Sequence, residues 1–426
     1  MRSPREPAAF TQVVGRVFLL AAALCAVLGA RAIQGDARPA SNRSGEPSQV
    51  RLSWTGDPRT TMTVMWQTDR PTPGAVVEYG PTQRLGARAP AVSPTYDDET
   101  GKLYEARIEG LEPGATYFYR VGSAGGGYSP VRRFRTAPSR IEDFTFTVFA
   151  DHGLGQAARM NVARVARERP AFHLLPGDLS YANGRQTVWD QWFGLIEPLA
   201  STTPLMVTLG NHENERIGAR RIGYAATLAR TAMPGREQWY AFDYAGVRFV
   251  ALNSDDYRNA EQRAWLTRTL ADARKDASVR WLIVFMHHPF YSTTARRGDN
   301  GGLIREWLEV LQSGGVDLLL CGHNHNYERS HPLPVAPDAP ARNGRTAQGE
   351  GLVQVISGGG GAGLYEFSDR RPLWCAARAK RWHYLQVRVP RDGPIEVRAI
   401  DTLTGATLDR FTIAPRHSGG PQGRMR

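Results

Sequence analysis

Five short motifs in this chain combine Asp, Asn and His, which are residue types that bind metal ions. They are DHG at residues 151–153, GDLSY at 177–181, GNHE at 210–213, HHP at 287–289 and GHNH at 322–325. Each follows an apolar run typical of a strand buried on both faces, at residues 144–149, 172–175, 205–209, 281–285 and 316–320. Ligand sites in open α/β sheets lie beyond the carboxyl ends of the strands. We therefore expect the motifs to meet in one place.

The donors divide into two groups that share Asp178, since a carboxylate has two oxygens. Two metal ions can generate hydroxide, orient a phosphorus atom and absorb the negative charge that makes phosphate esters resistant to hydrolysis. The first group has three anionic oxygens and suits a trivalent ion, and the second suits a divalent ion. The first group is Asp151, Asp178, Tyr181 and His325, and the second is Asp178, Asn211, His287 and His323. The sequence thus predicts an unequal two-metal hydrolytic site.

Tyr181 determines which metal the first group would select. A phenol with a pKa of about 10 ionises at working pH only on a strongly polarising ion such as ferric iron. The alternative is an ordinary aromatic side chain that packs beside Asp178. Because Tyr181 lies three residues beyond Asp178 in GDLSY, ligation is favoured.

Composition indicates a globular protein that attracts anions. The chain has 426 residues, 41% hydrophobic and 22% charged, and a net charge of +12. Its Arg residues are dispersed, whereas nucleic-acid binding usually needs a clustered stripe, so we expect no nucleic-acid partner. The basic charge favours acidic substrates by electrostatic steering.

The amino terminus has the pattern of an export signal. Arg2, Arg5 and Arg16 precede an apolar stretch at residues 17–29, and Ala-Arg-Ala at 30–32 fits a cleavage site. We expect a signal peptide at residues 1–32, a linker at 33–48, and a mature protein that is secreted or in the periplasm or cell envelope, without stable membrane insertion. Cys321 ends an apolar run, which favours a buried free thiol over a disulfide.

Two folded domains follow the linker. Period-two alternation with turn signals at residues 49–137 predicts an all-β sandwich domain. Apolar strands alternate with amphipathic helices, such as residues 261–274, over 143–415, which predicts an α/β layered domain of the αββα type. Residues 416–426 are rich in Gly, Arg and Ser and are expected to be a disordered tail.

These residues resemble the purple acid phosphatase family of metallophosphoesterases. Its motif series of DxG, GDxxY, GNH followed by an acid, VxxH and GHxH is matched in order, and residues 110–121 are similar to a fibronectin type III domain. The resemblance implies that all seven residues of the two donor groups bind metal, with Fe(III) paired with divalent Zn, Fe or Mn. It also implies that hydroxide attacks a phosphate monoester. Many two-metal phosphoesterases place a ligand His at the position of Gly153, so the missing ligand and the Tyr181 phenol fit each other.

The resemblance also suggests substrate contacts. His212 matches a residue that contacts phosphate and protonates the leaving oxygen, with a purely orienting role as the alternative. Related plant enzymes carry paired histidines nine and ten residues after His287, where this chain has Arg296 and Arg297. These guanidinium groups either bind phosphate or form a solvated loop. We expect His152 and His288 to be packed or hydrogen-bonded and not to bind metal, Glu213 to be structural or to support the ligands, and Tyr327 to Arg329 to supply hydrogen bonds.

Two other functions stay open at this point. One is a phosphodiesterase or nucleotide-cleaving enzyme with the same metal core. The other is a secreted binding module that has lost activity, although the complete donor set argues against it. The sequence specifies no oligomeric state.

Overall fold

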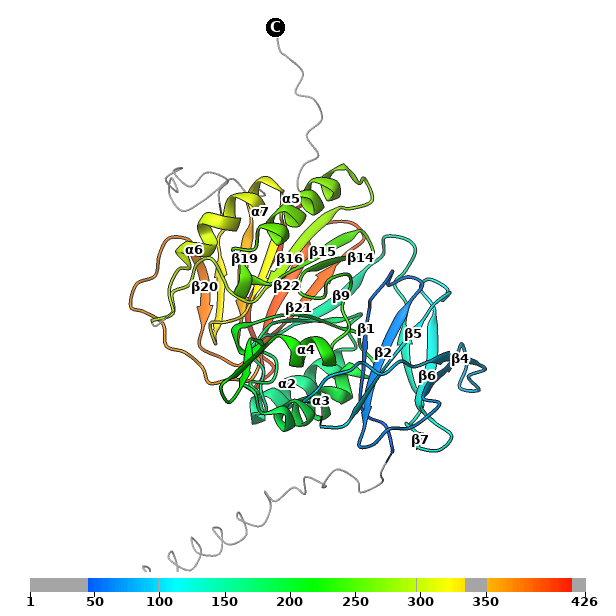
Figure 1. Ribbon diagram of the computed structural model, residues 1–426. Coiled ribbons are helices and arrows are strands. Elements are labelled where there is room, and N and C mark those ends of the chain that lie inside the picture. The colour runs from blue at the N-terminus through cyan, green and yellow to red at the C-terminus, as the bar shows by residue number, and fades with distance from the viewer. Residues whose placement is uncertain (1–44, 99, 296, 334–350, 416–426) are drawn as a thin grey trace, which may run out of the picture. The chain divides into compact units, whose positions relative to one another are not determined.

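A computed structural model describes residues 45–98, 100–295, 297–333 and 351–415 (Figure 1). The predicted signal at residues 1–32, most of the linker and the tail at 416–426 lie outside these residues. Residues from Gly45 onward belong to one unit. Within the described ranges, no helix is long and apolar enough to cross a membrane.

The first domain consists of two antiparallel sheets, coloured blue to cyan in Figure 1. Trp66 and Tyr104 pair across neighbouring strands, and their rings stack with centroids 5.5 Å apart. Such cross-strand aromatic pairs stabilise a sheet whose alternate residues face the core. One sheet has the order β1 (Ser48–Ser53), β2 (Met62–Thr68), β5 (Lys102–Ile108), and the other has β4 (Ala87–Pro90), β3 (Val76–Gly80), β6 (Thr116–Ser123), β7 (Gly127–Tyr128), with β8 (Arg132–Arg135) also paired to β6. The predicted all-β region is confirmed.

The second domain contains two larger mixed sheets. The first has the order β11 (Leu205–Thr208), β10 (His173–Pro176), β9 (Phe144–Val148), β21 (His383–Val389), β22 (Ile395–Asp401), β23 (Thr407–Ile413). The second has the order β14 (Tyr240–Tyr244), β15 (Val247–Leu252), β16 (Trp281–Met286), β17 (Leu318–Cys321), β19 (Val353–Ser357), β18 (Tyr327–Ser330), β20 (Cys375–Ala379). Strands β9 to β11 are mutually parallel, as are β15, β16, β17 and β19. A separate hairpin joins β12 (Glu215–Ile217) and β13 (Arg220–Gly223).

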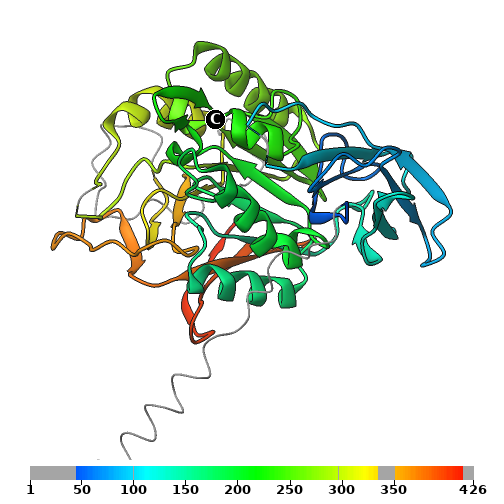
Figure 2. The same ribbon diagram turned by 60° about the horizontal axis from the view of Figure 1, so that its bottom comes forward.

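Helices cover the outer faces of the two sheets. Val162 of α2 (Gln156–Glu168) packs with the first sheet, and Leu266 and Leu270 of α5 (Ala260–Lys275) pack with the second. Figures 1 and 2 show α2 and α3 on one side of the strands and α5 to α7 on the other. The helical elements are α2 (Gln156–Glu168), α3 (Gln186–Ala200), α4 (Ala225–Arg230), α5 (Ala260–Lys275), α6 (Gly301–Leu303), α7 (Glu309–Ser313), the 3-10 turns η1 (Asn211–Glu213) and η2 (Ser254–Asp256), and the π-turn η3 (Ile304–Leu308). The predicted αββα layering and the helix at 261–274 are confirmed.

The inner faces of the two sheets form one aromatic core. Phe249 of β15 meets Phe146 and Phe172 edge to face, with centroids 5.2 and 5.1 Å apart. Since helices cover one face of each strand and the opposite sheet covers the other, these strands have almost continuous apolar sequences. Cys321 and Cys375 are free thiols in buried positions.

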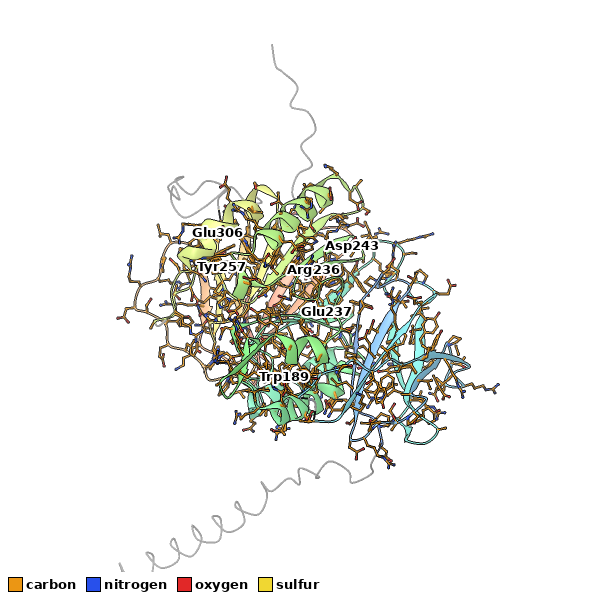
Figure 3. The ribbon with its side chains drawn as sticks, in the orientation of Figure 1. Trp189, Arg236, Glu237, Asp243, Tyr257 and Glu306 are labelled. Carbon is orange, nitrogen blue, oxygen red and sulfur yellow. The ribbon has the colours of Figure 1, made fainter. Side chains whose placement is uncertain are left out.

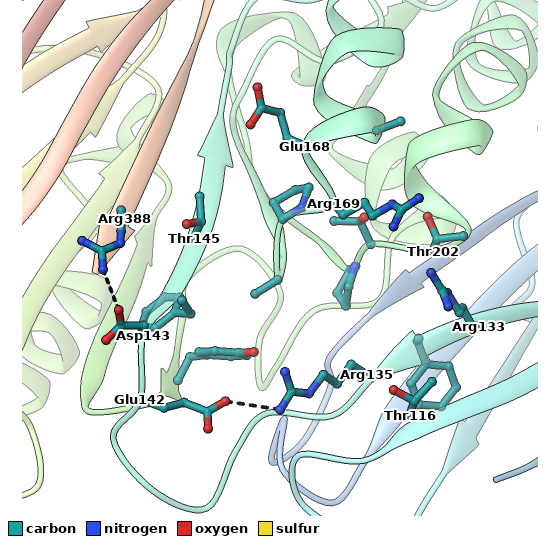
Figure 4. Close-up of a pocket in the computed structure, with 18 residues that line it drawn as sticks. Thr116, Arg133, Arg135, Glu142, Asp143, Thr145, Glu168, Arg169, Thr202 and Arg388 are labelled. Carbon is teal, nitrogen blue, oxygen red and sulfur yellow. Dashed lines mark hydrogen bonds and ion pairs between the residues drawn. The ribbon is translucent and has the colours of Figure 1, made fainter. Parts of the chain in front are cut away.

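The β-sandwich packs against the layered domain around α3. Tyr119 donates its phenolic hydrogen to the Ser201 carbonyl (2.7 Å), and Arg132 pairs with Glu197 (2.6 Å). Trp189, labelled in Figure 3, anchors α3 from inside by donating Nε1–H to Glu215 (2.9 Å). Nearby, a cleft of about 700 Å³ is bordered by paired charges such as Arg135 with Glu142 and Arg388 with Asp143 (Figure 4), and contains none of the predicted metal donors.

Candidate metal centre

The five motifs meet at the carboxyl ends of neighbouring parallel strands from both sheets. Strands β10, β9 and β11 are adjacent in the first sheet, and β16 and β17 are adjacent in the second. The two sheets are joined at this edge, because the backbone N–H of His323 donates to Asp151 Oδ2 at 2.8 Å. The structure brings together all seven predicted donors, Asp151, Asp178, Tyr181, Asn211, His287, His323 and His325.

Several of these residues adopt strained backbone conformations. The φ angles of Asp151, Asp178, Tyr181 and His323 are 57°, 52°, 56° and 68°. Residues other than Gly rarely adopt this left-handed backbone conformation, which costs roughly 1–3 kcal/mol per residue. Such strain persists only where the surrounding structure fixes it, which is typical of functional sites.

Asp151, Tyr181 and His325 present three donor atoms at nearly equal spacing. The Tyr181 oxygen lies 3.2 Å from Asp151 Oδ1 and 2.9 Å from His325 Nε2, and those two atoms are 3.3 Å apart. Neighbouring ligands on an octahedral ion with bonds of about 2.1 Å lie about 3 Å apart. His325 Nδ1 donates to the Gly363 carbonyl (2.7 Å), which leaves Nε2 able to bind a metal. The trio therefore has the spacing and tautomer of one face of a coordination sphere.

The second group is centred on His287. Its Nε2 lies 3.3 Å from Asp178 Oδ1, 3.3 Å from Asn211 Oδ1 and 3.2 Å from His323 Nδ1. Its other nitrogen donates to the Pro176 carbonyl at 2.9 Å, so Nε2 is the one that faces the group. One donor atom each of Asp151, Asp178 and His287 lies within 4.8 Å of the others, so the two groups adjoin near Asp178.

The electrostatics of the site fit bound cations. The residues Asp151 and Asp178 are 0% and 1% exposed, and buried charges of this kind need compensation. Burial would raise the pKa of Asp178, but the adjacent His287 lowers it below its usual range. Burial and the Asp151 charge raise the pKa of the Tyr181 phenol well above 10. Tyr181 would therefore ionise only on a strongly polarising metal.

Glycines allow the motif loops to approach each other closely. A Cβ on Gly210 would lie 2.2 Å from Asp178 Oδ1, and one on Gly322 would lie 2.5 Å from Asp151 Oδ2. A Cβ on Gly358 would lie 2.1 Å from the Asn324 carbonyl and 2.9 Å from Asp151 Oδ2. The run of glycines at 358–361 has no local pattern that indicates the site, because its contacts are with residues distant in the sequence.

Glu213 holds two motif loops together. Its buried carboxylate accepts the backbone N–H groups of Asp178 (2.8 Å), Leu179 (2.9 Å) and Gly210 (2.8 Å). Burial and the nearby Asp178 charge raise its pKa. This is the supporting role that the sequence suggested.

Comparison with known proteins shows the family. Residues 47–136 match the purple acid phosphatase N-terminal domain, and residues 144–327 match the calcineurin-like phosphoesterase domain. The chain is 32% identical over 351 residues to purple acid phosphatase 18 of Arabidopsis thaliana, covering 79% of this chain and 76% of the relative. This chain belongs to the purple acid phosphatase family. It is also 30% identical over 409 residues to acid phosphatase type 7 of Homo sapiens, covering 86% and 90% of the two chains.

A solved structure supports the fold. Purple acid phosphatase PPD1 from yellow lupin matches with a TM-score of 0.78 at 22% identity, covering 88% of this chain and 75% of that one. The protein is thus an acid phosphatase with a metallophosphoesterase fold, and its family implies a dinuclear metal centre.

In this purple acid phosphatase, His212 lies beside the metal donors, and its side chain is 29% exposed. Its backbone N–H donates to Asp178 Oδ1 (3.0 Å), and its ring lies 4.5 Å from that of Tyr181. The Nδ1–H donates to Asn183 Oδ1 at 2.6 Å, and Nε2 lies 3.8 Å from Asp178 Oδ2. Asn183 was missed in the sequence, although it lies two residues after Tyr181.

Arg297 and Tyr365 border the phosphatase site on another side. The Tyr365 ring stacks on His325 with centroids 4.0 Å apart and an interplanar angle of 14°. The Arg297 guanidinium lies 5.5 Å above the Tyr365 ring, and its Nη1 is 2.8 Å from His323 Nε2. Arg296 lies outside the described residues. No local pattern marked Tyr365, because its position depends on a loop that returns from β19.

The two extra histidines are held by other groups. His152 accepts from Trp192 Nε1 at 3.0 Å and stacks on Phe149. His288 contacts the Ser254 hydroxyl at 3.0 Å, and its ring lies 4.2 Å from that of His323. These contacts give His152 a packing role, whereas His288 also has a ring nitrogen within 4.8 Å of donor atoms of His287 and His323 and so adjoins the second donor group.

Proposed function

We propose that the chain is a secreted acid phosphatase that hydrolyses small phosphate monoesters at a two-metal site. The observation that carries the proposal is the junction of two complementary donor groups beside the buried Asp178. We propose residues 1–32 as the signal peptide, 49–137 as the fibronectin III-like domain and 143–415 as the catalytic domain.

The donor chemistry favours two different metals. Asp151, Asp178, Tyr181 and His325 would hold Fe(III), since a phenolate and carboxylates are hard, anionic ligands. Asp178, Asn211, His287 and His323 would hold divalent Zn, Fe or Mn. Such a pair supplies an activated hydroxide and neutralises charge that develops on the phosphoryl group.

The protein's own side chains would bind the substrate and move its proton. Arg297, at the rim beside His323, would bind phosphate oxygens through its guanidinium. His212, oriented by the Nδ1–H bond to Asn183, would act as the imidazolium, donating its Nε2 proton to the leaving alcohol and remaining as the neutral imidazole. Protonation of the leaving group would give His212 a role although it is not one of the proposed metal ligands.

A substrate comparison tests the reaction. Purified protein loaded with iron and zinc is expected to hydrolyse 4-nitrophenyl phosphate faster than bis(4-nitrophenyl) phosphate. A preference for the bis-ester would instead indicate a phosphodiesterase with the same metal core. If neither ester is hydrolysed from acidic to alkaline pH, the proposal is rejected and an inactive binding module replaces it.

Metal removal tests the cofactor. Dialysis against a chelator is expected to abolish activity, and adding iron with zinc is expected to restore it, because without metals the site lacks both the nucleophile and charge neutralisation. Atomic absorption should count two metal ions per chain. Full activity in demonstrably metal-depleted protein would contradict the mechanism.

Secretion can be tested separately. The protein recovered outside the cell membrane is expected to begin after Ala32, as determined by amino-terminal sequencing. An intact amino terminus in the cytoplasmic fraction would contradict export.

A further inference from the structure

A buried carboxylate on β18 faces the loop that carries Arg297 and not the metal donors. Glu328 is 1% exposed, and four groups of the loop donate to it. They are the Ser292 hydroxyl (2.6 Å), the Thr293 backbone N–H (2.7 Å), the Thr293 hydroxyl (2.7 Å) and the Thr294 hydroxyl (3.3 Å). A carboxylate in this position is costly to bury unless it is hydrogen-bonded, and here both oxygens have partners.

The same loop is held by Asn324 of the GHNH motif and by Asn326, the residue that follows the motif. Asn326 Nδ2 donates to the Thr294 hydroxyl at 3.0 Å, and Asn324 Nδ2 donates to the Arg297 carbonyl at 3.1 Å. Glu328 follows the predicted metal ligands His323 and His325 in the same stretch of chain. This stretch therefore contacts both the metal centre and the loop that carries Arg297.

A second set of contacts joins the loop to the Tyr365 segment. The Ala295 N–H donates to the Glu366 carbonyl at 3.0 Å, and the Ser368 N–H donates to the Thr293 carbonyl at 2.7 Å. The Tyr365 N–H in turn donates to the His325 carbonyl at 3.0 Å. The loop is thus fixed between β18 and the segment that bears the aromatic ring beneath Arg297.

We propose that Glu328 is a positioning residue that fixes residues 292–295 so that Arg297 and Tyr365 form one side of the phosphate-binding site. The inference rests on the proposed function, in which Arg297 binds phosphate oxygens. Glu328 acts on substrate binding through the loop and touches neither substrate nor metal.

Glu328→Gln tests this with little change in shape. A Gln amide offers two acceptor lone pairs on one oxygen only, and its NH2 group would face either the Thr293 N–H or the hydroxyls. The loop would lose part of its anchoring while the volume of the side chain is kept. We expect KM for 4-nitrophenyl phosphate and the inhibition constant of inorganic phosphate to rise about tenfold, with kcat within about twofold and metal content unchanged.

Arg297→Ala provides the reference. It is expected to raise both constants roughly ten- to hundredfold, the effect of losing a charged hydrogen bond. If Glu328 acts through Arg297, the double variant should be no weaker in substrate binding than Arg297→Ala alone. Additive losses would overturn the positioning role.

Asp409→Asn is the matched control, because Asp409 lies on β23 and binds two residues of β18, the strand that carries Glu328. Asp409 accepts from the Tyr327 hydroxyl and from Arg329 Nε, both at 2.7 Å, and does not contact the arginine loop. The Asp409→Asn variant should have a lower free energy of unfolding, with KM and the inhibition constant of phosphate unchanged. If KM rises as much in Asp409→Asn as in Glu328→Gln, general destabilisation explains both variants and the inference is overturned.

The remaining outcomes separate the two proposals. If Arg297→Ala leaves KM unchanged, the proposed role of Arg297 fails, and the inference fails with it. If Arg297→Ala raises KM but Glu328→Gln does not, only the positioning role is rejected. If Glu328→Gln does not fold, Thr294→Val replaces it. This variant removes one donor to Glu328 and the acceptor of Asn326, so KM and the inhibition constant of phosphate should rise in the same way. Unchanged constants in Thr294→Val would reject the positioning role.

Discussion

At the residue scale, replacement of Tyr181 is the most direct test of whether the first metal is ferric iron. Its oxygen lies within 3.2 Å of Asp151 Oδ1 and 2.9 Å of His325 Nε2. A phenolate on ferric iron absorbs visible light by charge transfer, so the purified, metal-loaded protein is expected to be coloured. Tyr181→Phe should abolish the colour and reduce iron content while the fold, measured by circular dichroism, stays intact.

The control for Tyr181→Phe is Tyr365→Phe. Tyr365 stacks on His325 through its ring, so removing its hydroxyl leaves this contact in place and should leave the colour unchanged. A wild-type protein that is active but colourless, and loses nothing in Tyr181→Phe, would contradict the ferric site without contradicting a two-metal mechanism.

At the element scale, the contact between β6 and the end of α3 joins the two domains. Tyr119 is fully buried, and its hydroxyl donates to the Ser201 carbonyl at 2.7 Å. Tyr119→Phe leaves that carbonyl without its donor and should lower the free energy of unfolding by about 1–2 kcal/mol. Urea denaturation followed by fluorescence would measure it, and we expect a single transition, since one aromatic core continues from Trp54 to Phe172.

Tyr117→Phe is the matched control for this contact. Tyr117 lies on the same strand, but its hydroxyl accepts from the Glu112 N–H within the sandwich, in an exposed setting. Its replacement should change the free energy of unfolding by less than about 0.5 kcal/mol. Equal losses for both variants, or two separate transitions, would contradict a shared folding unit.

The elements also show what the sequence could and could not predict. Strand-end motifs and period-two strands are local patterns, so the strands before Asp151 and His287 and the helix α5 were predictable. The insertion of β19 between β17 and β18, and the pairing of β21 with β9, join distant segments and leave no local pattern. Tyr365 was missed for that reason, since the return of the chain from β19 places it against His325.

At the scale of the whole molecule, two buried histidines outside the donor set connect stability to pH. His173 and His383 are fully buried, and desolvation lowers the pKa of both below the ordinary value of 6.5. For His383 the pKa falls to about 4. The folded protein therefore leaves these rings neutral at pH values where the unfolded chain would bind protons.

This difference predicts that the protein loses stability as the solution becomes acidic. Between pH 6.5 and about 4 the unfolded state binds a proton at His383 and the folded state does not, so the free energy of unfolding should fall by about 1.4 kcal/mol per pH unit for this residue. Above pH 6.5 the effect should vanish, because neither state is protonated. His383→Asn keeps a donor near Nδ1, which bonds the Arg381 carbonyl at 2.9 Å, but cannot titrate. Urea unfolding from pH 7.5 to 5 should therefore give a shallower pH slope in this variant than in wild type, and parallel slopes would show that His383 does not cause the acid sensitivity.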